Sequence, residues 1–235
     1  MNTLAHAPCL DNPIWHSLLT VHDRFAVGEK LARRFPSEVG PLAGIREQSE
    51  EAYQELGELF SPDEPAVLFL DSAPKLPEGW RTHVHVPLDQ MILSGVIAAS
   101  GNETALLALG AADVQEMLEL TALTEPGPFR PRTYELGEFW GIRENGHLAA
   151  MAGQRLALPG FIEISAVCTH PDFRGRRYSA SLVSAMARAI DQRGQTPILH
   201  VLPTNAAAIS VYESVGFVKR RSFDLTVVFP PTRSA

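Results

Sequence analysis

The chain has 235 residues, of which 45% are hydrophobic and 20% are charged, a composition that excludes a largely disordered protein. Its formal net charge of −7 argues against a nucleic-acid partner, and no apolar run reaches the ~18 residues that a membrane-spanning helix needs. Cys9 and Cys168 lie far apart without metal-ligand spacing and no signal-peptide pattern begins the chain, so we expect a cytoplasmic protein without a metal.

The first hundred residues predict helices followed by short strands, without a catalytic constellation. Residues 36–60 have helical apolar spacing and an acidic outer face, and the breaker-rich SPDEP follows them. Residues 66–71 predict a short buried strand, and the alternation in residues 81–88 predicts a half-exposed one. His83 and His85 share a face of that strand, but we interpret them as surface histidines because no third metal ligand accompanies them.

A small, polar, glycine-bearing segment, residues 94–104, indicates a domain boundary near residue 100. We therefore predict an N-terminal domain over residues 1–100 and a second domain over residues 101–235. The second domain alternates strands and helices, and Asn145-Gly146 predicts a hairpin because this pair tolerates positive φ. Its expected strands are 104–110, two within 137–156, 161–169, 197–202, 217–220 and 223–229, and its expected helices are 111–123, 178–193 and 205–215.

The stretch HPDFRGRRYSA, residues 170–180, places three arginines and a glycine between a strand and a helix. The strand, residues 161–169, is apolar on both faces, which is typical of a strand covered on both sides. A helix N-terminus offers free N–H groups and the positive end of the helix dipole, and arginine adds charge-assisted hydrogen bonds to phosphate. The turn therefore indicates an anion site, and the alternative is an exposed turn with solvated arginines.

A second pattern follows in PTNAAAISVYESVGF. Asn205 stands near a helix start, and Tyr212 lies seven residues on, close to two turns, so the two share one face. The alanines after Asn205 keep the first turn thin enough for a ligand or another chain to approach. The alternative is an ordinary packed helix with a half-buried tyrosine.

Together the two patterns make residues 103–228 resemble the GNAT superfamily of acyl-CoA-dependent N-acyltransferases. One signature is R-x-x-G-x-G/A after a strand, here Arg174 to Ser179. The other is N-x-x-A-x-x-x-Y-x-x-x-G-F, here Asn205 to Phe217. The first copy is imperfect, because Arg177 stands at the glycine position and Ser179 at the glycine-or-alanine position. We predict ordinary helical dihedral angles for Arg177, with its side chain meeting a CoA phosphate.

The resemblance implies an α/β (α+β) fold with a mixed, partly splayed central sheet flanked by helices. Residues 1–100 would be a companion or cap domain, or a degenerate copy of the same fold. Acetyl-CoA, as the acyl-donor substrate, would lie between the strand ending near Thr169 and the strand around Leu199. The donor-binding residues implied are Val167, Cys168, Thr169, Arg174, Gly175, Arg176, Arg177, Tyr178, Ser179, Asn205 and Ala208.

Two residues receive catalytic roles by the resemblance. Tyr212 would stand near the thioester sulfur and protonate the departing thiolate, or else only position the thioester. Glu163 interrupts an apolar strand, and partial burial would raise its pKa towards the range of a general base; the alternative is an edge-exposed or salt-bridged glutamate. An acyl-enzyme on Cys168 is disfavoured because the motif offers no histidine partner.

The resemblance thus implies an N-acyltransferase that moves an acyl group, most simply acetyl from acetyl-CoA, to a primary amine of a small molecule by direct attack on the thioester. The alternative is a non-catalytic acyl-CoA-binding or sensing module. The loop of residues 126–134 corresponds to the acceptor side, where Arg130 or Arg132 could bind a substrate carboxylate. We expect no nucleic-acid or membrane partner, and a homodimer is left open.

Overall fold

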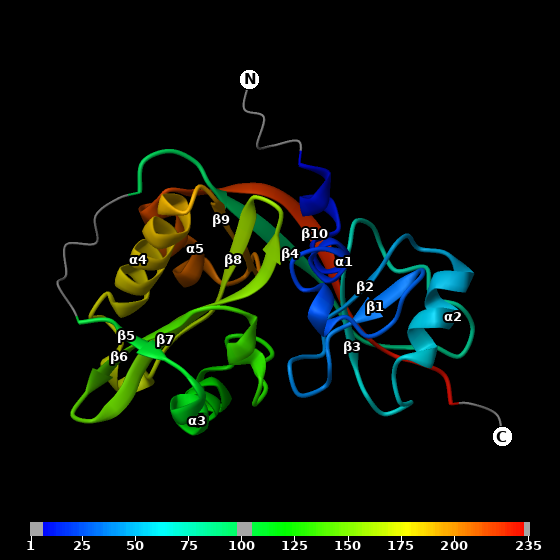
Figure 1. Cartoon of the computed structure of the whole chain (residues 1–235), viewed down its shortest axis with the longest axis horizontal. Coiled ribbons are helices and arrows are strands. Elements are labelled where there is room, and N and C mark those ends of the chain that lie inside the picture. Colours follow the sequence, from blue (N-terminus) through cyan, green and yellow to red (C-terminus); the bar gives the residue numbers. More distant parts are fainter. Residues whose placement is uncertain (1–6, 98–104, 233–235) are drawn as a thin grey trace.

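The computed structural model describes residues 7–97 and 105–232, and its centre is an eight-stranded sheet (Figure 1). The strands lie in the order β3-β10-β4-β9-β8-β7-β6-β5, and β8–β9 is the one parallel pair among them. The strands are β3 (Ala66–Leu70), β4 (Arg81–Leu93), β5 (Leu107–Leu109), β6 (Phe139–Glu144), β7 (His147–Leu158), β8 (Phe161–Thr169), β9 (Thr196–Val201) and β10 (Phe217–Phe229).

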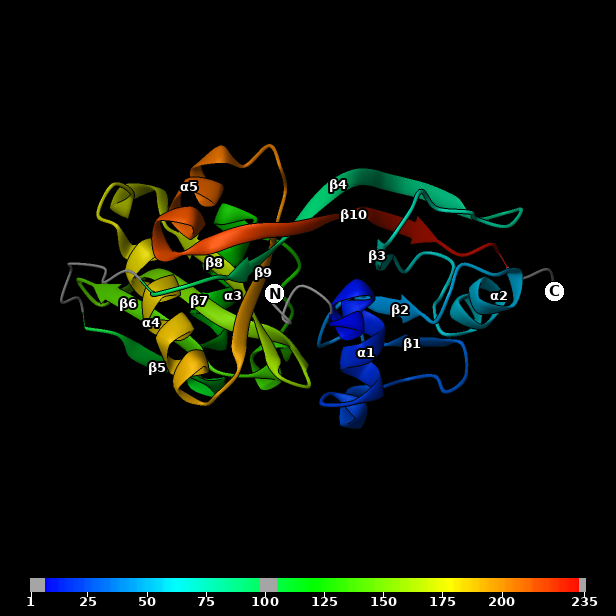
Figure 2. The same ribbon diagram turned by 90° about the horizontal axis from the view of Figure 1, so that it is seen from above.

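Two long strands join the two lobes of the molecule. β4 and β10 pair antiparallel along their whole length and run from the lobe with α4 and α5 to the lobe with α2 (Figure 2). The smaller lobe adds a two-stranded sheet of β1 (Ala32–Arg34) and β2 (Ala43–Ile45), and helix α2 (Glu50–Glu58). Strands from both sides of the boundary predicted near residue 100 therefore build one sheet, and part of the predicted boundary segment lies outside the described residues.

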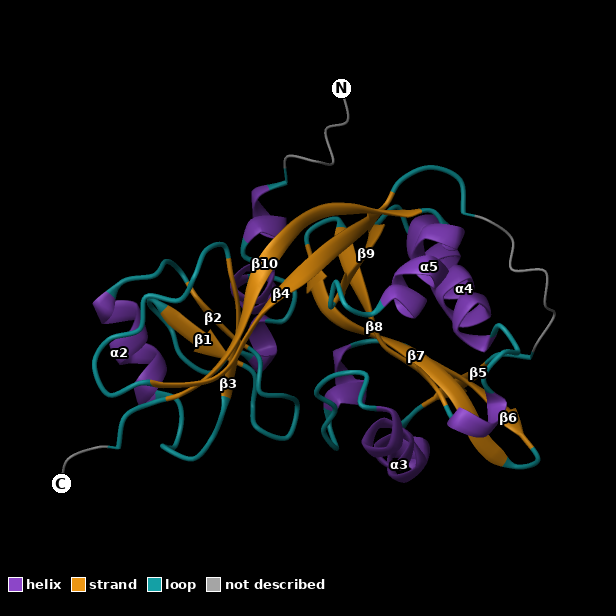
Figure 3. Cartoon of the chain, turned by 180° about the vertical axis from the view of Figure 1, so that it is seen from behind, coloured by secondary structure: helices purple, strands orange, loops and turns teal. Residues whose placement is uncertain are grey.

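Helices cover both faces of the sheet (Figure 3). On one face α4 (Tyr178–Gln192) and α5 (Ala206–Val215) close an apolar core in which Leu182, Met186 and Ile190 are fully buried. On the other face lie α1 (Pro13–Leu19) and α3 (Val114–Thr124), each with its own cluster of buried side chains. The predicted mixed α/β class is confirmed. None of the helices in the described ranges is both long and apolar enough to span a membrane.

The element predictions hold where the signal is local. The Asn145-Gly146 hairpin forms with φ of 52° and 85°, and α4 and α5 begin and end within a residue of the predicted bounds. The helix predicted over residues 36–60 is wrong, because residues 43–45 pair with β1 and only Glu50–Glu58 is helical. The two closing strands are one strand, β10, in which a bulge near Lys219 and Arg221 absorbs the irregularity.

The sheet opens between β8 and β9. Their parallel pairing covers only the start of β8 and ends at Glu163, which lies opposite Ile198. Further along β8, the register with β7 shifts by one residue, and Ala166 has a φ of 51°. A bulge of this kind bends a strand and breaks its ladder. The splayed sheet that the resemblance implies is therefore present, and its opening faces the start of α4.

Candidate active site

A cavity of about 610 Å³ occupies the opening between the splayed strands. Its walls come from the end of β8, the turn before α4 with the start of that helix, most of α5 and the end of α3. Tyr212 lines it, and Glu163 does not. Every residue predicted to bind the donor lines this one cavity: Val167, Cys168, Thr169, Arg174, Gly175, Arg176, Arg177, Tyr178, Ser179, Asn205 and Ala208.

The end of β8 supplies backbone groups to the cavity. Cys168 and Thr169 pair with Met151 and Ala150 of β7 along one edge of the strand. Strand β9 no longer pairs with the other edge beyond Glu163, so the N–H and C=O groups there are available to a ligand. An extended chain bearing amide groups, such as a pantetheine arm, can pair with such an edge in the manner of an added strand.

The turn before α4 contains two residues in the left-handed region. Gly175 has a φ of 80°, and Arg177 has a φ of 62° and a ψ of 20°. The prediction of ordinary helical angles at Arg177 is therefore wrong, although a non-glycine residue in this region costs roughly 1–2 kcal/mol. Left-handed residues next to right-handed ones turn successive N–H groups into a concave anion site. No side chain caps α4, so its first N–H groups stay free for an anion.

The arginines of this turn differ in what they contact. Arg176 lies 3.8 Å from Glu144 and stacks over the ring of Phe173 at 5.2 Å. Arg174 and Arg177 are exposed, and neither side chain forms an ion pair within the described ranges. Two positive groups at the rim of the cavity are therefore available to phosphate oxygens.

The next two residues close the turn onto the core. Tyr178 is buried, and its hydroxyl donates to Glu144, so this residue can offer only backbone to a ligand. The hydroxyl of Ser179 lies 3.0 Å from that of Thr169, which ties the start of α4 to the end of β8.

Helix α5 forms the opposite wall. Asn205 caps it, because its Oδ1 accepts from the N–H of Ala208 at 3.1 Å, and its side-chain NH₂ is left for a ligand. Tyr212 is 7% exposed, and burial raises the pKa of its hydroxyl to about 12. That hydroxyl makes no hydrogen bond to any residue that the structure describes. The tyrosine is therefore a protonated donor beside the cavity at neutral pH.

Comparisons with known proteins agree with this geometry. A family model described as FR47-like protein matches residues 139–224. A crystal structure of a protein from Novosphingobium aromaticivorans, assigned to the GNAT family of acetyltransferases, has a TM-score of 0.87 and 36% identity, covering 95% of this chain and 99% of that one. The chain belongs to the GNAT family.

Two more distant GNAT structures share the fold. A GCN5-related N-acetyltransferase from Kribbella flavida has a TM-score of 0.61 and 17% identity, covering 91% of this chain and 93% of its own. One from Sphaerobacter thermophilus has a TM-score of 0.52 and 14% identity, covering 83% and 74%. A search of curated proteins finds no match to the chain.

Glu163 is a fully buried, salt-bridged carboxylate in this GNAT protein. Arg155 donates to both of its oxygens, at 2.9 and 2.6 Å, and His200 Nδ1 lies 2.7 Å from Oε1. Burial favours the neutral acid, but Arg155 and His200 outweigh it and hold the pKa of Glu163 at about 2. The expected rise of this pKa is therefore wrong, because the carboxylate is buried together with the guanidinium of Arg155 and a hydrogen-bonding histidine.

Cys168 lines the cavity and is buried. Burial raises the pKa of its thiol to about 11, and its side chain packs in one apolar cluster with Met117 and Leu120 of α3. A thiol with such a pKa is almost entirely protonated at neutral pH and is a weak nucleophile. The geometry thus gives Cys168 a packing role next to Tyr212.

The loop that was predicted to form the acceptor side does not bring its arginines to the cavity. Arg132 forms a bidentate pair with Glu135 at 2.7 and 2.9 Å, and neither Arg130 nor Arg132 lines the cavity. A residue that sequence reasoning missed, Glu125, does line it. The signal that could have found Glu125 is its position at the end of a predicted helix, directly before the loop of residues 126–134.

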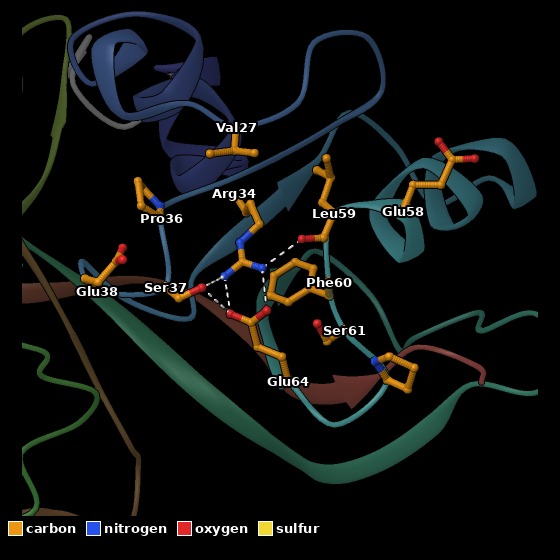
Figure 4. Close-up of a pocket in the computed structure, with 11 residues that line it drawn as sticks. Val27, Arg34, Pro36, Ser37, Glu38, Glu58, Leu59, Phe60, Ser61 and Glu64 are labelled. Carbon is orange, nitrogen blue, oxygen red and sulfur yellow. Dashed lines mark hydrogen bonds and ion pairs between the residues drawn. The ribbon is translucent and has the colours of Figure 1, made fainter. Parts of the chain in front are cut away.

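A second cavity, of about 590 Å³, lies in the smaller lobe around Arg34 (Figure 4). The guanidinium of Arg34 uses all five N–H donors, on the carbonyls of Phe35 and Leu59, the hydroxyl of Ser37 and both oxygens of Glu64. The hydrogen bonds that Arg34 donates to Glu64 hold the pKa of this carboxyl group at about 2. Because all five N–H donors of Arg34 are hydrogen-bonded within the protein, this cluster stabilises the smaller lobe and leaves no donor for an anionic ligand.

Proposed function

We propose that this GNAT protein is an N-acetyltransferase that moves the acetyl group of acetyl-CoA to a primary amine of a small molecule. The observation that carries the proposal is the single cavity in which the unpaired edge of β8, the arginine turn and Tyr212 meet. Each of these three features suits one part of an acyl-CoA molecule: the pantetheine amides, the pyrophosphate and the thioester.

The proposed reaction is direct transfer. The acceptor ammonium first gives a proton to solvent, and the neutral nitrogen then attacks the thioester carbon. The tetrahedral intermediate collapses as the C–S bond breaks, the electron pair leaves with sulfur, and the second amine proton ends on the thiol. We assign stabilisation of the developing oxyanion to N–H groups at the edge of β8 that β9 leaves unpaired beyond Glu163.

Tyr212 assists the leaving group by donating a hydrogen bond to the sulfur. Its pKa of about 12 exceeds that of an ordinary thiol, about 8.5, so complete proton transfer to the thiolate is uphill by about 5 kcal/mol. The hydrogen bond, rather than the transferred proton, is therefore its contribution. The proposal does not use Glu163 as the base, because a carboxylate with a pKa of about 2 accepts a proton from an ammonium poorly.

The test is release of the CoA thiol from acetyl-CoA in the presence of a panel of primary amines, with acetyl-CoA binding measured separately by calorimetry. Amine-dependent thiol release is the expected result. Binding of acetyl-CoA without release by any amine would contradict the transferase and support the alternative, a module that binds or senses acyl-CoA.

A further inference from the structure

The end of helix α3 brings one carboxylate to the cavity. Thr124, Glu125 and Pro126 form this part of the wall, and Glu125 is the only acidic residue among the described residues that line it. Leu120 of α3 packs in one buried apolar cluster with Cys168 of β8, which holds α3 against the strand that lines the cavity. Glu125 is exposed and lines the same cavity as Cys168 and Tyr212.

The local structure does not explain a glutamate at this position. Glu125 ends α3 in the left-handed conformation, with a φ of 48° and a ψ of 52°, where glycine or asparagine is usual. Its negative charge also stands at the negative end of the helix dipole, which is unfavourable. Its side chain has no hydrogen-bond or ion-pair partner in the part of the chain that the structure describes. Residues that break local rules in this way concentrate at functional sites.

We propose that Glu125 binds the ammonium group of the acceptor, so that the preferred acceptors are aliphatic amines that are cationic at neutral pH. This inference rests on the proposed function. A carboxylate accepts charge-assisted hydrogen bonds from an ammonium ion. Neither Arg130 nor Arg132 lines the cavity, and Arg132 is paired with Glu135, so neither is placed to bind a carboxylate group of the acceptor. The role of Glu125 is recognition and positioning of the amine before it loses its proton to solvent.

The experiment compares two amines of similar shape, benzylamine, which is an ammonium ion at neutral pH, and aniline, which is neutral there. Glu125→Gln should lower kcat/KM for benzylamine about 10- to 100-fold, the usual worth of a hydrogen bond to a charged group, and that for aniline less than about threefold. The KM for acetyl-CoA should stay within about twofold of the wild-type value. Glu125→Asp should recover part of the loss. Glu119→Gln, an exposed position on α3 outside the cavity, is the matched control and should change neither amine.

A second variant separates binding from structure. Glu125→Gly removes the left-handed strain together with the carboxylate, so its Tm should equal or exceed that of the wild type while benzylamine turnover falls as in Glu125→Gln. Equal losses for both amines, or no loss for either, would overturn the role of Glu125 and leave the transferase standing. Absence of thiol release with every amine in the wild type would overturn the transferase, and this inference with it.

Discussion

Arg177 occupies a backbone conformation that its side chain does not favour. Its φ of 62° is one that glycine adopts without strain, and the family pattern has glycine at this position. Arginine in place of that glycine therefore has a glycine-like backbone conformation and adds a positive charge to the turn. The free N–H groups at the start of α4 depend on this shape. Arg177 therefore combines a strained backbone with an additional positive group at the rim of the cavity.

Replacing Arg177 by glycine should separate these two effects. The strain of roughly 1–2 kcal/mol disappears, while glycine adds about 0.5–1 kcal/mol of chain entropy to the unfolded state, so the free energy of unfolding should rise by up to about 1 kcal/mol. Affinity for CoA should fall about 5- to 10-fold, as expected for the loss of one charged contact. Arg177→Ala, which keeps the strain, should lose the same affinity without the gain in stability. Calorimetry and urea unfolding measure both, and unchanged affinity in both variants would refute the phosphate contact.

Tyr212→Phe tests the leaving-group hydrogen bond. The hydroxyl has no partner among the described residues, so its removal should leave packing intact and lower kcat about 10- to 100-fold. The KM for acetyl-CoA should stay within about twofold, because the hydrogen bond strengthens only as charge develops on sulfur. Steady-state kinetics with single-turnover confirmation make the measurement. A kcat equal to that of the wild type, with chemistry limiting, would leave Tyr212 only a packing role.

At the scale of elements, local signals predicted β8, α4, α5 and the Asn145-Gly146 hairpin, because each carries its own periodicity, cap or turn residue. The failures have long-range causes. Ala43–Ile45 is extended because β1 offers it a partner, and the acidic helical pattern around it could not show this. β10 continues through the Lys219–Arg221 charges because β4 pairs with it on both sides of a bulge. That the residues expected to bind the donor line one cavity was predictable for the same reason that α5 was, since they lie in two short sequence motifs.

The buried Glu163 links three strands through an ion pair and a hydrogen bond. Arg155 on β7 and His200 on β9 both bind Glu163 on β8, just where the two central strands begin to separate. Burying a lone carboxylate is costly, and a sequence shows the carboxylate without its partners. The contacts with Arg155 and His200 therefore offset the cost of burying Glu163, and they link the strands at the point where β8 and β9 separate.

The buried ion pair of Glu163 makes the free energy of unfolding depend on pH. The folded pKa of Glu163, about 2, lies below the unfolded value of about 4.3, so its contribution is fully present above about pH 4.3 and is lost as the pH falls towards 2. The shift corresponds to about 3 kcal/mol. Glu163→Gln should lower stability at neutral pH by about 3–5 kcal/mol, because Arg155 stays buried without its counter-charge, and should flatten the acid decline.

The measurement is urea unfolding of the wild type and Glu163→Gln between pH 3 and 7. Glu135→Gln, which breaks the exposed pair with Arg132, is the matched control and should cost less than about 1 kcal/mol. Parallel stability curves for the wild type and Glu163→Gln across this range would contradict the assigned pairing.

At the scale of the whole molecule, the smaller lobe contacts the loop that continues from Glu125 at the wall of the cavity. The loop that follows Glu125 returns to the residues before β2, where the N–H of Arg132 donates to the carbonyl of Glu38 and the hydroxyl of Thr133 to that of Val39. His22 Nε2, whose ring is kept neutral because burial lowers its pKa, lies 3.1 Å from the carbonyl of Leu136. These contacts join segments about a hundred residues apart, which is why the position of this loop could not be predicted from the sequence.

Thr133→Val tests this connection with little change of shape. The buried hydroxyl donates to Val39 at 2.7 Å and accepts from the N–H of Arg130 at 2.7 Å, so the variant should lose about 1–3 kcal/mol of stability. Because the loop continues directly from Glu125 and Pro126, its loosening should raise the KM of the acceptor amine about 3- to 10-fold through misplacement of the wall, with the KM of acetyl-CoA unchanged. Thr226→Val, a buried threonine of β10 outside the cavity, is the control for general destabilisation. Similar increases of the acceptor KM in both variants would show that the smaller lobe stabilises the fold without positioning the acceptor. An increase confined to Thr133→Val would show that acceptor binding depends on the smaller lobe, although that lobe carries neither of the two donor-binding motifs.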